Sequence, residues 1–216
     1  ILRCPFLVLA LLIVSSSEGA ESAFPNLLGS CSSPLRGSSP ARIQNVRLAV
    51  EKISGRILNP SQAFSFNKTV GKRTLEAGFL YAPAIINSSL KDVVGGGICQ
   101  VSSTIFNAVL LSDLEILERY RHHTPINYLP LGMDATISWG TKDFRFRNTS
   151  AGRIRIVGRV SDETVAFEIY GEKPLQDELR LETEIAESPS LLPDDKSEPG
   201  LEIELYLLRL RGGKLI

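Results

Sequence analysis

Apolar residues recur at the spacing of an amphipathic helix in two segments, 42–53 and 98–111. After the first segment comes Gly55, at a position where glycine commonly ends a helix. The second segment has the stronger apolar stripe, formed by Val101, Ile105, Ala108, Val109 and Leu111. The pattern therefore predicts an N-terminal helix and a central helix.

The period of the pattern becomes two after the central helix. Apolar and polar residues alternate over 136–138, 144–147, 153–160 and 164–170, and turn residues separate these runs. A shorter alternation over 63–66 adds one strand ahead of the central helix. Several short strands in succession indicate an antiparallel sheet, so the expected fold class is α+β.

The remaining segments are expected to be irregular or peripheral. Residues 21–41 are rich in Ser, Pro and Gly and predict an extended lead-in, and residues 67–97 predict mainly loop. Residues 175–200 have the composition of a flexible acidic linker, and 201–210 have the pattern of one more strand. Together the last two segments form an acidic, strand-containing tail from 175 to 216.

The first twenty residues have the pattern of a secretory signal. Arg3 precedes an apolar run from Pro5 to Val14, and small residues follow as far as Ala20. The run is shorter than the roughly 20 residues that a membrane-spanning helix needs. We therefore expect export of the chain to the cell envelope or the extracellular space. An uncleaved anchor or a buried helix is the alternative.

Composition narrows the classes of function. Of the 216 residues, 43% are hydrophobic, which excludes a chain that is disordered throughout. Residues 1–174 carry 19 basic and 14 acidic side chains, whereas residues 175–216 carry 5 and 10. This excess of positive charge is too small to indicate nucleic-acid binding. The sequence has no phosphate-loop lysine or dinucleotide fingerprint and too few metal ligands, so we expect neither a cofactor nor a metal.

The chemically informative segment opens the central helix and reads Gly95-Gly96-Gly97-Ile98-Cys99-Gln100-Val101-Ser102. It places Cys99 near the first turn, where the helix dipole and unpaired N–H groups favour an anion and lower the pKa of a thiol. Cys99 is therefore a candidate nucleophile. The glycines allow a close approach of the backbone to a ligand, and Gln100 is a candidate oxyanion donor. The candidate substrate-binding residues are Gly95, Gly96, Gly97, Gln100, Ser102 and Arg119.

Two adjacent histidines, His122 and His123, supply the candidate base. Neighbouring residues of an extended segment face opposite ways, so at most one of the two is expected in the site. Asp134 and Asp143 are both candidates for orienting the imidazole. A cysteine that opens a helix, followed by a sheet that carries a histidine, is the papain-like order of elements.

Less specific interpretations of these features stay open. A cysteine in an apolar helix is often a small core residue, and three glycines can form a plain turn. In an exported chain Cys31 and Cys99 can form a disulfide, which would count against catalysis. Arginines that alternate on two predicted strands form either ordinary solvated charge or one basic face suited to a binding module: Arg145, Arg147, Arg153 and Arg155.

Several motifs resemble those of the VanW family. They occur in order, without a large gap, between about Leu27 and Glu172, and they are Leu58–Asn67, Val70–Thr74, Gly95–Thr104, Gly132–Thr136 and Asp143–Asn148. The family pattern Glu-Arg-x-x-His-Ser fits Glu118, Arg119 and His122, with His123 where Ser is usual. This match favours His122 as the base.

The resemblance implies a VanW-like domain over 27–174 in an exported cell-envelope protein. For some family members it implies cysteine-dependent L,D-transpeptidase activity on peptidoglycan, and the namesake of the family is an accessory protein of vancomycin-resistance clusters. We therefore expect peptidoglycan as the partner, a peripheral association with the envelope, and acyl transfer through Cys99. A non-catalytic module that binds peptidoglycan or another glycopeptide is the alternative.

Overall fold

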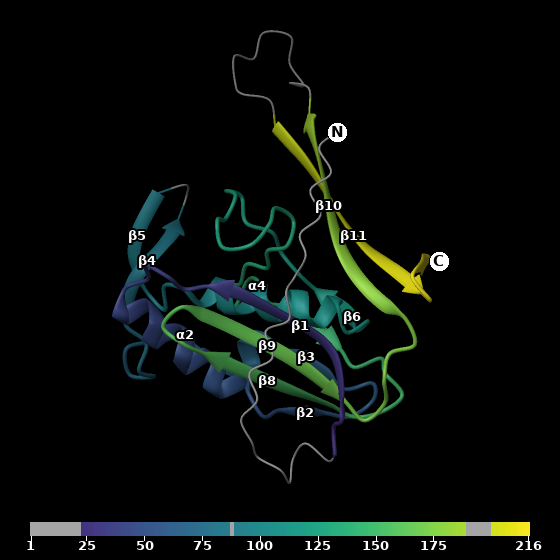
Figure 1. Ribbon diagram of the computed structural model, residues 1–216. Coiled ribbons are helices and arrows are strands. Elements are labelled where there is room, and N and C mark those ends of the chain that lie inside the picture. Colours follow the sequence, from purple (N-terminus) through teal and green to yellow (C-terminus); the bar gives the residue numbers. More distant parts are fainter. Residues whose placement is uncertain (1–22, 87–88, 189–199) are drawn as a thin grey trace.

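The computed structural model describes residues 23–86, 89–188 and 200–216, and the signal predicted over 1–20 lies outside them. Within the described residues the chain combines a few helices with many strands (Figure 1). Every pair of strands there is antiparallel. The expected mixture of helices and antiparallel strands is therefore confirmed.

The largest sheet has four strands, in the order β1 (Asn26–Pro34), β9 (Thr164–Gly171), β8 (Ile154–Val160) and β2 (Ile57–Leu58). Two helices pack against it, α2 (Pro40–Ile53) and α4 (Ile98–Leu110) (Figure 1). Alternate side chains of β8 and β9 are fully buried, which is the pattern of strands with one covered face. The two helices occupy the positions that the apolar stripes predict, within two residues.

A second sheet has three strands, in the order β3 (Ala63–Ser65), β7 (Arg145–Arg147) and β6 (Glu115–Glu118). A short helix, α3 (Phe66–Val70), follows β3 directly. The ring of Phe106 on α4 meets the ring of Phe144 edge to face, with the centroids 5.7 Å apart. This aromatic contact joins α4 to the start of β7.

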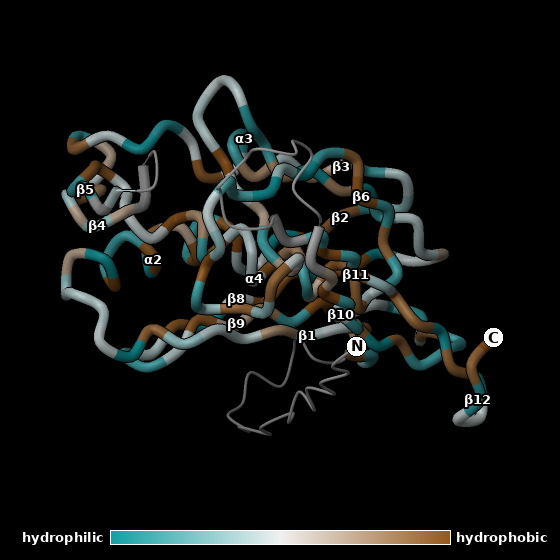
Figure 2. The backbone as a smooth tube through the Cα atoms, turned by 90° about the horizontal axis from the view of Figure 1, so that it is seen from above, coloured by the Kyte–Doolittle hydropathy of each residue, from teal (hydrophilic) through white to brown (hydrophobic). Residues whose placement is uncertain are grey.

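Helix α4 is buried almost all round. All its residues except Cys99 and Leu110 are buried. Figure 2 shows apolar stretches of β8 and β9 beside this helix. A helix covered on every side is rigidly placed, so the first turn of α4 holds Cys99 at a fixed position at the edge of the core. Among the described residues no helix is long and apolar enough to span a membrane.

Two segments expected to be irregular contain strands. The lead-in over 21–41 contains β1, so a strand precedes the first helix of the described chain. The loop expected over 67–97 contains the hairpin of β4 (Tyr81–Ile86) and β5 (Ser89–Val94). The sequence of β1 has a low strand propensity, and its strand is set by pairing with β9 along its whole length.

The expectation of a flexible acidic linker over residues 175–200 is also wrong in part. Residues 178–188 form β10 (Glu178–Ser188), which pairs with β11 (Gly200–Arg211), and β12 (Lys214–Leu215) completes a third sheet. The side chain of Arg209 forms an ion pair with Asp113, and Leu205 packs against the core. The hairpin therefore docks on the domain, while its β12 end lies away from it (Figure 2).

Of the two interpretations of the alternating arginines, the single basic sheet face is not formed in the described chain. Arg145 and Arg147 lie on β7, whereas Arg155 lies on β8 in the other sheet. Three of the arginines are ion-paired, Arg145 with Glu118, Arg147 with Glu115 and Arg153 with Glu172. The predicted strands over 144–147 and 153–160 follow each other closely in the sequence. The turn between them, however, carries the chain from the sheet of β7 to the sheet of β8.

The backbone at Gly96 leaves no room for a side chain. A Cβ atom there would lie 2.1 Å from the carbonyl oxygen of Ala82, which belongs to the paired strand β4. We expect Gly96→Ala to lower the free energy of unfolding by roughly 3 kcal/mol, because backbone atoms must move to relieve the overlap. Urea unfolding of the wild-type protein and of Gly96→Ala measures the difference in the free energy of unfolding.

Gly37→Ala is the matched control for Gly96→Ala. Gly37 has a φ of 79°, but a Cβ atom there would meet nothing within 4 Å. Gly37→Ala is therefore expected to lose only about 1 kcal/mol of stability, because alanine must adopt the left-handed backbone conformation of this position. Equal losses for the two variants would contradict the close approach of Gly96 to β4.

Candidate functional site

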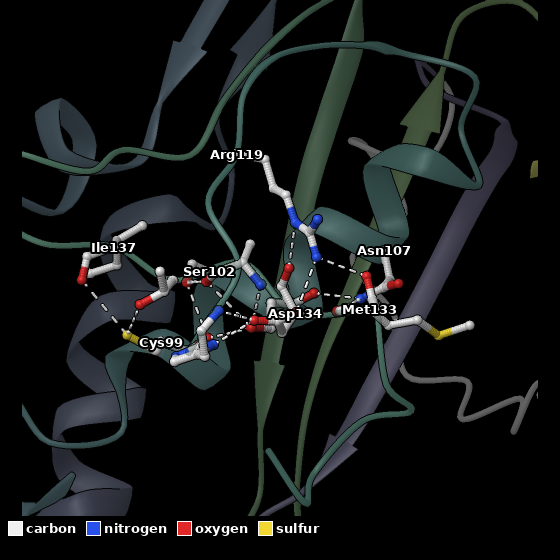
Figure 3. Close-up of polar contacts among 12 residues, drawn as sticks. Cys99, Ser102, Asn107, Arg119, Met133, Asp134 and Ile137 are labelled. Atoms are coloured by element: carbon white, nitrogen blue, oxygen red, sulfur yellow. Dashed lines mark hydrogen bonds and ion pairs between the residues drawn. The ribbon is translucent and has the colours of Figure 1, made fainter. Parts of the chain in front are cut away.

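Cys99 is the second residue of α4, and the turn that precedes it is built by glycine. Gly97 caps the helix with a φ of 104°, a conformation that glycine adopts without strain. The Cys99 Sγ lies 3.6 Å from Thr136 Oγ1 and 3.7 Å from the Ile137 carbonyl oxygen (Figure 3). The thiol therefore leaves the buried helix toward the segment that contains Thr136 and Ile137.

His122 and Asp134 form a close pair beside this thiol. The Asp134 Oδ2 lies 2.6 Å from His122 Nδ1 and also accepts the His122 backbone N–H at 2.6 Å. With Nδ1 engaged, Nε2 is the ring nitrogen left to interact with Cys99, and His122 and Cys99 are close enough to shift each other's pKa. The three side chains therefore follow the order thiol, imidazole, carboxylate.

Arg119 holds the carboxylate from its other side. Its guanidinium donates to Asp134 Oδ1 at 3.0 Å, to the Asp134 carbonyl at 2.7 Å and to the Gly132 carbonyl at 2.8 Å (Figure 3). It also lies over the Phe106 ring, 5.2 Å from the centroid. Arg119 was expected among the substrate-binding residues. Its hydrogen bonds instead position Asp134, although its side chain also borders the pocket described below.

The electrostatics of the site favour a charged Cys99–His122 pair. Burial, the largest influence, raises the pKa of the Cys99 thiol, but hydrogen bonds with His122, Ile137 and Thr136 and the His122 charge outweigh it, so its pKa is lowered. Burial lowers the pKa of His122, but the hydrogen bond to Asp134 and the contact with Cys99 raise it to about 9. A thiolate beside an imidazolium is the reactive form of a nucleophilic cysteine.

Of the two candidate carboxylates, only Asp134 reaches His122. Burial raises the pKa of Asp134, but hydrogen bonds with His122 and the nearby Arg119 lower it below its ordinary value, so the group is ionised at neutral pH. The Asp143 carboxylate instead accepts the Ser65 hydroxyl and the backbone N–H groups of Asn67 and Phe144. It fixes the junction between β3 and α3, and its candidacy for orienting the imidazole is wrong.

Two expected substrate contacts have structural roles. The Gln100 side chain is 2% exposed and donates both amide hydrogens, to Ser33 Oγ and to the Pro34 carbonyl. It therefore has no N–H left for an oxyanion. The Ser102 hydroxyl is fully buried and donates to the Ala135 carbonyl at 2.5 Å. Both expectations are corrected because the covered first turn of α4 turns these side chains into the core.

The backbone around Cys99 offers the donors that the Gln100 side chain lacks. The N–H groups of Ile98 and Gln100 donate to the carbonyls of Gly95 and Gly97. Among the described residues, the N–H groups of Gly97 and Cys99 donate to no backbone carbonyl. The amide of a nucleophile at a helix N-terminus is well placed to stabilise a developing oxyanion.

A pocket of about 580 Å³ opens on the His122 side of the site. Its polar border includes Arg119, His122, His123 and Asp134. One apolar wall comes from β10 and β11 and consists of Leu181, Ile203, Leu205 and Leu207. The tail that was expected to be a linker therefore helps to enclose space next to His122. His123 is exposed and borders this pocket, whereas His122 is half-buried.

Three residues near Cys99 were missed by the sequence analysis. Arg42 and Arg73 are half-buried, and their guanidinium groups interact electrostatically with Cys99. The hydroxyl of Tyr128 is close enough to Cys99 and Arg42 to be affected by both, and burial raises its pKa. Arg73 lies in the family motif Val70–Thr74, but no pattern in the sequence assigns chemistry to any of the three residues, and only their approach in the fold identifies them.

The two cysteines of the described chain are both free. Cys31 is buried in the core, and burial raises the pKa of its thiol to about 12. The disulfide considered between Cys31 and Cys99 is therefore not formed, and Cys31 is an unreactive thiol. Among the described residues, no three His, Cys, Asp or Glu side chains meet in a group that could hold a metal ion.

We expect His122→Gln to raise the pKa of Cys99 above its ordinary value. Burial is the largest influence on this thiol, and the substitution removes its strongest opponent. Each unit of increase lowers the thiolate fraction at neutral pH about ten-fold. The pH dependence of alkylation by iodoacetamide measures the change. His123→Gln, at the exposed neighbour, is expected to leave the profile unchanged, and equal shifts in both variants would contradict the pairing.

Comparison with known proteins adds the following. Residues 41–170 match the family model described as VanW like protein. The chain is 38% identical over 168 residues to the uncharacterized protein YoaR of Bacillus subtilis (strain 168), covering 78% of this chain and 54% of that protein. It is 28% identical over 140 residues to the vancomycin B-type resistance protein VanW of Enterococcus faecalis (strain ATCC 700802 / V583), covering 62% and 51%. The chain thus spans about half the length of these curated relatives. No solved structure matches it.

Proposed function

Because the chain belongs to the VanW family, we propose that it acts on bacterial peptidoglycan by cysteine-dependent acyl transfer on stem peptides. One relative is named as a vancomycin resistance protein, which supports a role linked to the cell wall. The observation that carries the proposal is the hydrogen-bonded pair of His122 and Asp134 beside Cys99, where His122 and Cys99 shift each other's pKa. A thiol, an imidazole and a carboxylate in this order recur in cysteine enzymes of unrelated folds.

In the first step the Cys99 thiolate attacks a carbonyl carbon of the stem peptide. The carbonyl oxygen becomes an oxyanion, which the free N–H groups of Gly97 and Cys99 stabilise. The intermediate collapses when the C–N bond breaks, and the leaving amine takes the proton from the His122 imidazolium. The products are a thioester on Cys99 and a neutral imidazole.

In the second step an amine from a neighbouring stem attacks the thioester. His122 accepts the proton of this amine, a new amide bond forms and the Cys99 thiolate leaves. The result is a cross-link between two stems. If water attacks instead, the same residues release a trimmed stem. Asp134 keeps the imidazole oriented in both steps through its bond to Nδ1.

Two further observations support this role over a non-catalytic binding module. The basic sheet face on which a binder would rely is absent from the described residues, because its arginines are divided between sheets and three of the four are ion-paired. His122, Asp134 and Arg119 are also placed to control the reactivity of the Cys99 thiol. A papain-like order of a cysteine helix followed by histidine adds an analogy only.

We propose that the chain works outside the cytoplasmic membrane. The apolar run from Pro5 to Val14 after Arg3 supports export, and peptidoglycan is found only beyond that membrane. This segment lies outside the residues that the structure describes. Sequencing the N-terminus of the protein recovered from the envelope fraction tests the proposal.

Mass spectrometry of the full chain incubated with purified peptidoglycan fragments tests the activity. The expected result is an acyl adduct on the peptide that contains Cys99, together with cross-linked or trimmed stems. The nature of the stems identifies the bond and separates transfer from hydrolysis. Unchanged fragments and an unmodified Cys99 peptide, from protein that unfolds cooperatively, would overturn the proposed function.

A further inference from the structure

We infer that Arg42 and Arg73 form a subsite beside Cys99 that binds a free carboxylate of the acyl donor. This inference rests on the proposed function for the identity of the donor as a peptide. The anion-binding property itself does not depend on peptidoglycan as the substrate. Four observations support the subsite. They are the position of both side chains at the glycine turn, their neutral hydrogen-bond partners, their burial and the neighbouring ring of Trp139.

The glycine turn before Cys99 makes room for both arginines. A Cβ atom on Gly97 would lie 2.9 Å from Arg42 Cγ, and one on Gly95 would lie 2.9 Å from Arg73 Cβ. Arg42 comes from the first turn of α2, and Arg73 comes from the segment after α3. Two segments far apart in the chain therefore bring arginine side chains to the same turn, and any larger residue at Gly95 or Gly97 would displace them.

Both arginines lack a carboxylate partner. Arg42 donates to the Pro83 carbonyl at 3.2 Å and to Gln100 Oε1 at 2.8 Å. Arg73 donates to Asn67 Oδ1 at 2.7 Å and to the Gly71 carbonyl at 3.0 Å. Among the described residues, no carboxylate oxygen lies within ion-pair distance of either side chain. Each guanidinium has five N–H groups, so neutral acceptors leave donors unused.

These partners hold the arginines without neutralising them. Both side chains are half-buried, and a buried cation without a counter-ion is costly. The charge of Cys99 raises the pKa of both arginines against the effect of burial, and Asp143, beyond ion-pair distance, adds to this effect at Arg73. A protein that retains two such cations next to a nucleophile has a site prepared for an anion.

The neighbouring Trp139 gives the subsite one apolar wall. The Arg73 guanidinium lies 5.8 Å from the centre of the Trp139 ring. This ring is 48% exposed, although large aromatic side chains are usually covered. An arginine stacked on an aromatic ring keeps its edge free for a planar, bidentate partner, and a carboxylate has that geometry. We therefore favour a carboxylate close to the scissile carbonyl of the donor.

A pair of alkylating reagents tests the subsite without any knowledge of the substrate. Iodoacetate carries a carboxylate and iodoacetamide does not, and both react when the Cys99 sulfur displaces iodide and forms an S–C bond. The ratio of the two rates at Cys99, followed by peptide mapping and divided by the ratio for free glutathione, reports recognition of the carboxylate. Cys31 is buried and serves as an internal unreactive thiol.

The expected ratio is highest in the wild type. It falls about ten-fold in the double variant Arg42→Gln, Arg73→Gln, because charge-assisted hydrogen bonds to the carboxylate are lost. Arg42→Lys and Arg73→Lys are expected to retain part of the ratio. Arg47→Gln is the matched control, because Arg47 lies on the same helix and pairs with Asp162 at the surface. If the arginines only promote ionisation of the thiol, both rates fall together and the ratio stays constant, which would overturn the inference.

A peptide donor with a free C-terminal carboxylate, compared with its amide, separates this inference from the proposed function. Faster acylation of Cys99 by the free acid, with the difference lost in the double variant, supports both. Acylation at equal rates by acid and amide overturns the carboxylate subsite and keeps the acyl transfer. No acylation, together with a preserved iodoacetate preference, overturns the acyl transfer and keeps the subsite.

Discussion

Cys99→Ala is expected to reduce acyl transfer to background, a loss of at least about 10⁴-fold, because no other group can form the thioester. The Thr136 hydroxyl lies 3.6 Å from the Cys99 sulfur, but among the described residues it forms no hydrogen bond with an imidazole that could activate it. The measurement is the rate at which stem-peptide products appear, with the acyl adduct on the Cys99 peptide followed in parallel. The variant should fold normally, since a half-buried thiol contributes little to packing.

Cys31→Ala is the matched control for this substitution. It removes the other cysteine of the described chain, which lies in the core and takes no part in the series of Cys99, His122 and Asp134. We expect it to keep wild-type activity with a modest loss of stability, about 1 kcal/mol. Activity that survives in Cys99→Ala and disappears in Cys31→Ala would reverse the assignment of the nucleophile.

Asp134→Asn is expected to have the second largest effect, a fall of about 10³-fold in the rate of Cys99 acylation. The substitution preserves the shape of the side chain but removes the negative charge that stabilises the His122 imidazolium. An amide can also present its NH₂ group to Nδ1, which favours the wrong tautomer. Single-turnover acylation measures the effect. Asp143→Asn controls for a general loss of acidic residues, because Asp143 does not contact His122.

The pH profile gives Asp134→Asn a signature that a structural defect would not produce. The reactive pair exists above the pKa of Cys99 and below that of His122, which is raised to about 9. Removing the Asp134 charge lowers the pKa of His122, so the alkaline limit of activity should move downward from about 9. A variant with reduced activity but an unchanged alkaline limit would mean that Asp134 acts through the fold alone.

The same shift has a consequence for stability. The folded pKa of His122 is above its ordinary value of 6.5, so folding is stabilised by proton binding. This contribution is complete below about pH 6.5 and is lost as the pH rises through about 9. The thiol acts in the opposite sense, because its pKa is lowered on folding. The two groups therefore oppose each other, and the lowered pKa of Cys99 offsets part of the pH dependence that His122 adds to stability.

The sequence by itself determined the local elements and the position of the candidate nucleophile. The helical spacing of 42–53 and 98–111 and the alternation over 153–160 and 164–170 correspond to α2, α4, β8 and β9. These elements can be predicted because the spacing of apolar residues in the sequence shows which face of each helix or strand is buried. The location of Cys99 in the first turn of α4 can be predicted because it depends only on where this helix begins. A single glycine turn determines that start.

The strands that depend on pairing with a segment distant in the sequence could not be predicted from the spacing of apolar residues. β1 is rich in serine and glycine, and it is a strand because β9 offers a complete row of backbone partners. β10 has the composition of a linker, and it is a strand because β11 returns beside it. In both cases long-range pairing outweighs local propensity, which is weak for strands.

The choice between Asp134 and Asp143 and the presence of Arg42 and Arg73 were decided by the tertiary structure alone. The two aspartates are alike in sequence terms, but the carboxylate of Asp134 accepts from His122 and that of Asp143 accepts from the junction of β3 and α3. The arginines reach Cys99 from segments 26 and more residues away in the chain, through space that Gly95 and Gly97 leave open. Charge and hydrogen bonding act over a few ångströms, so only the fold determines which side chains share a site.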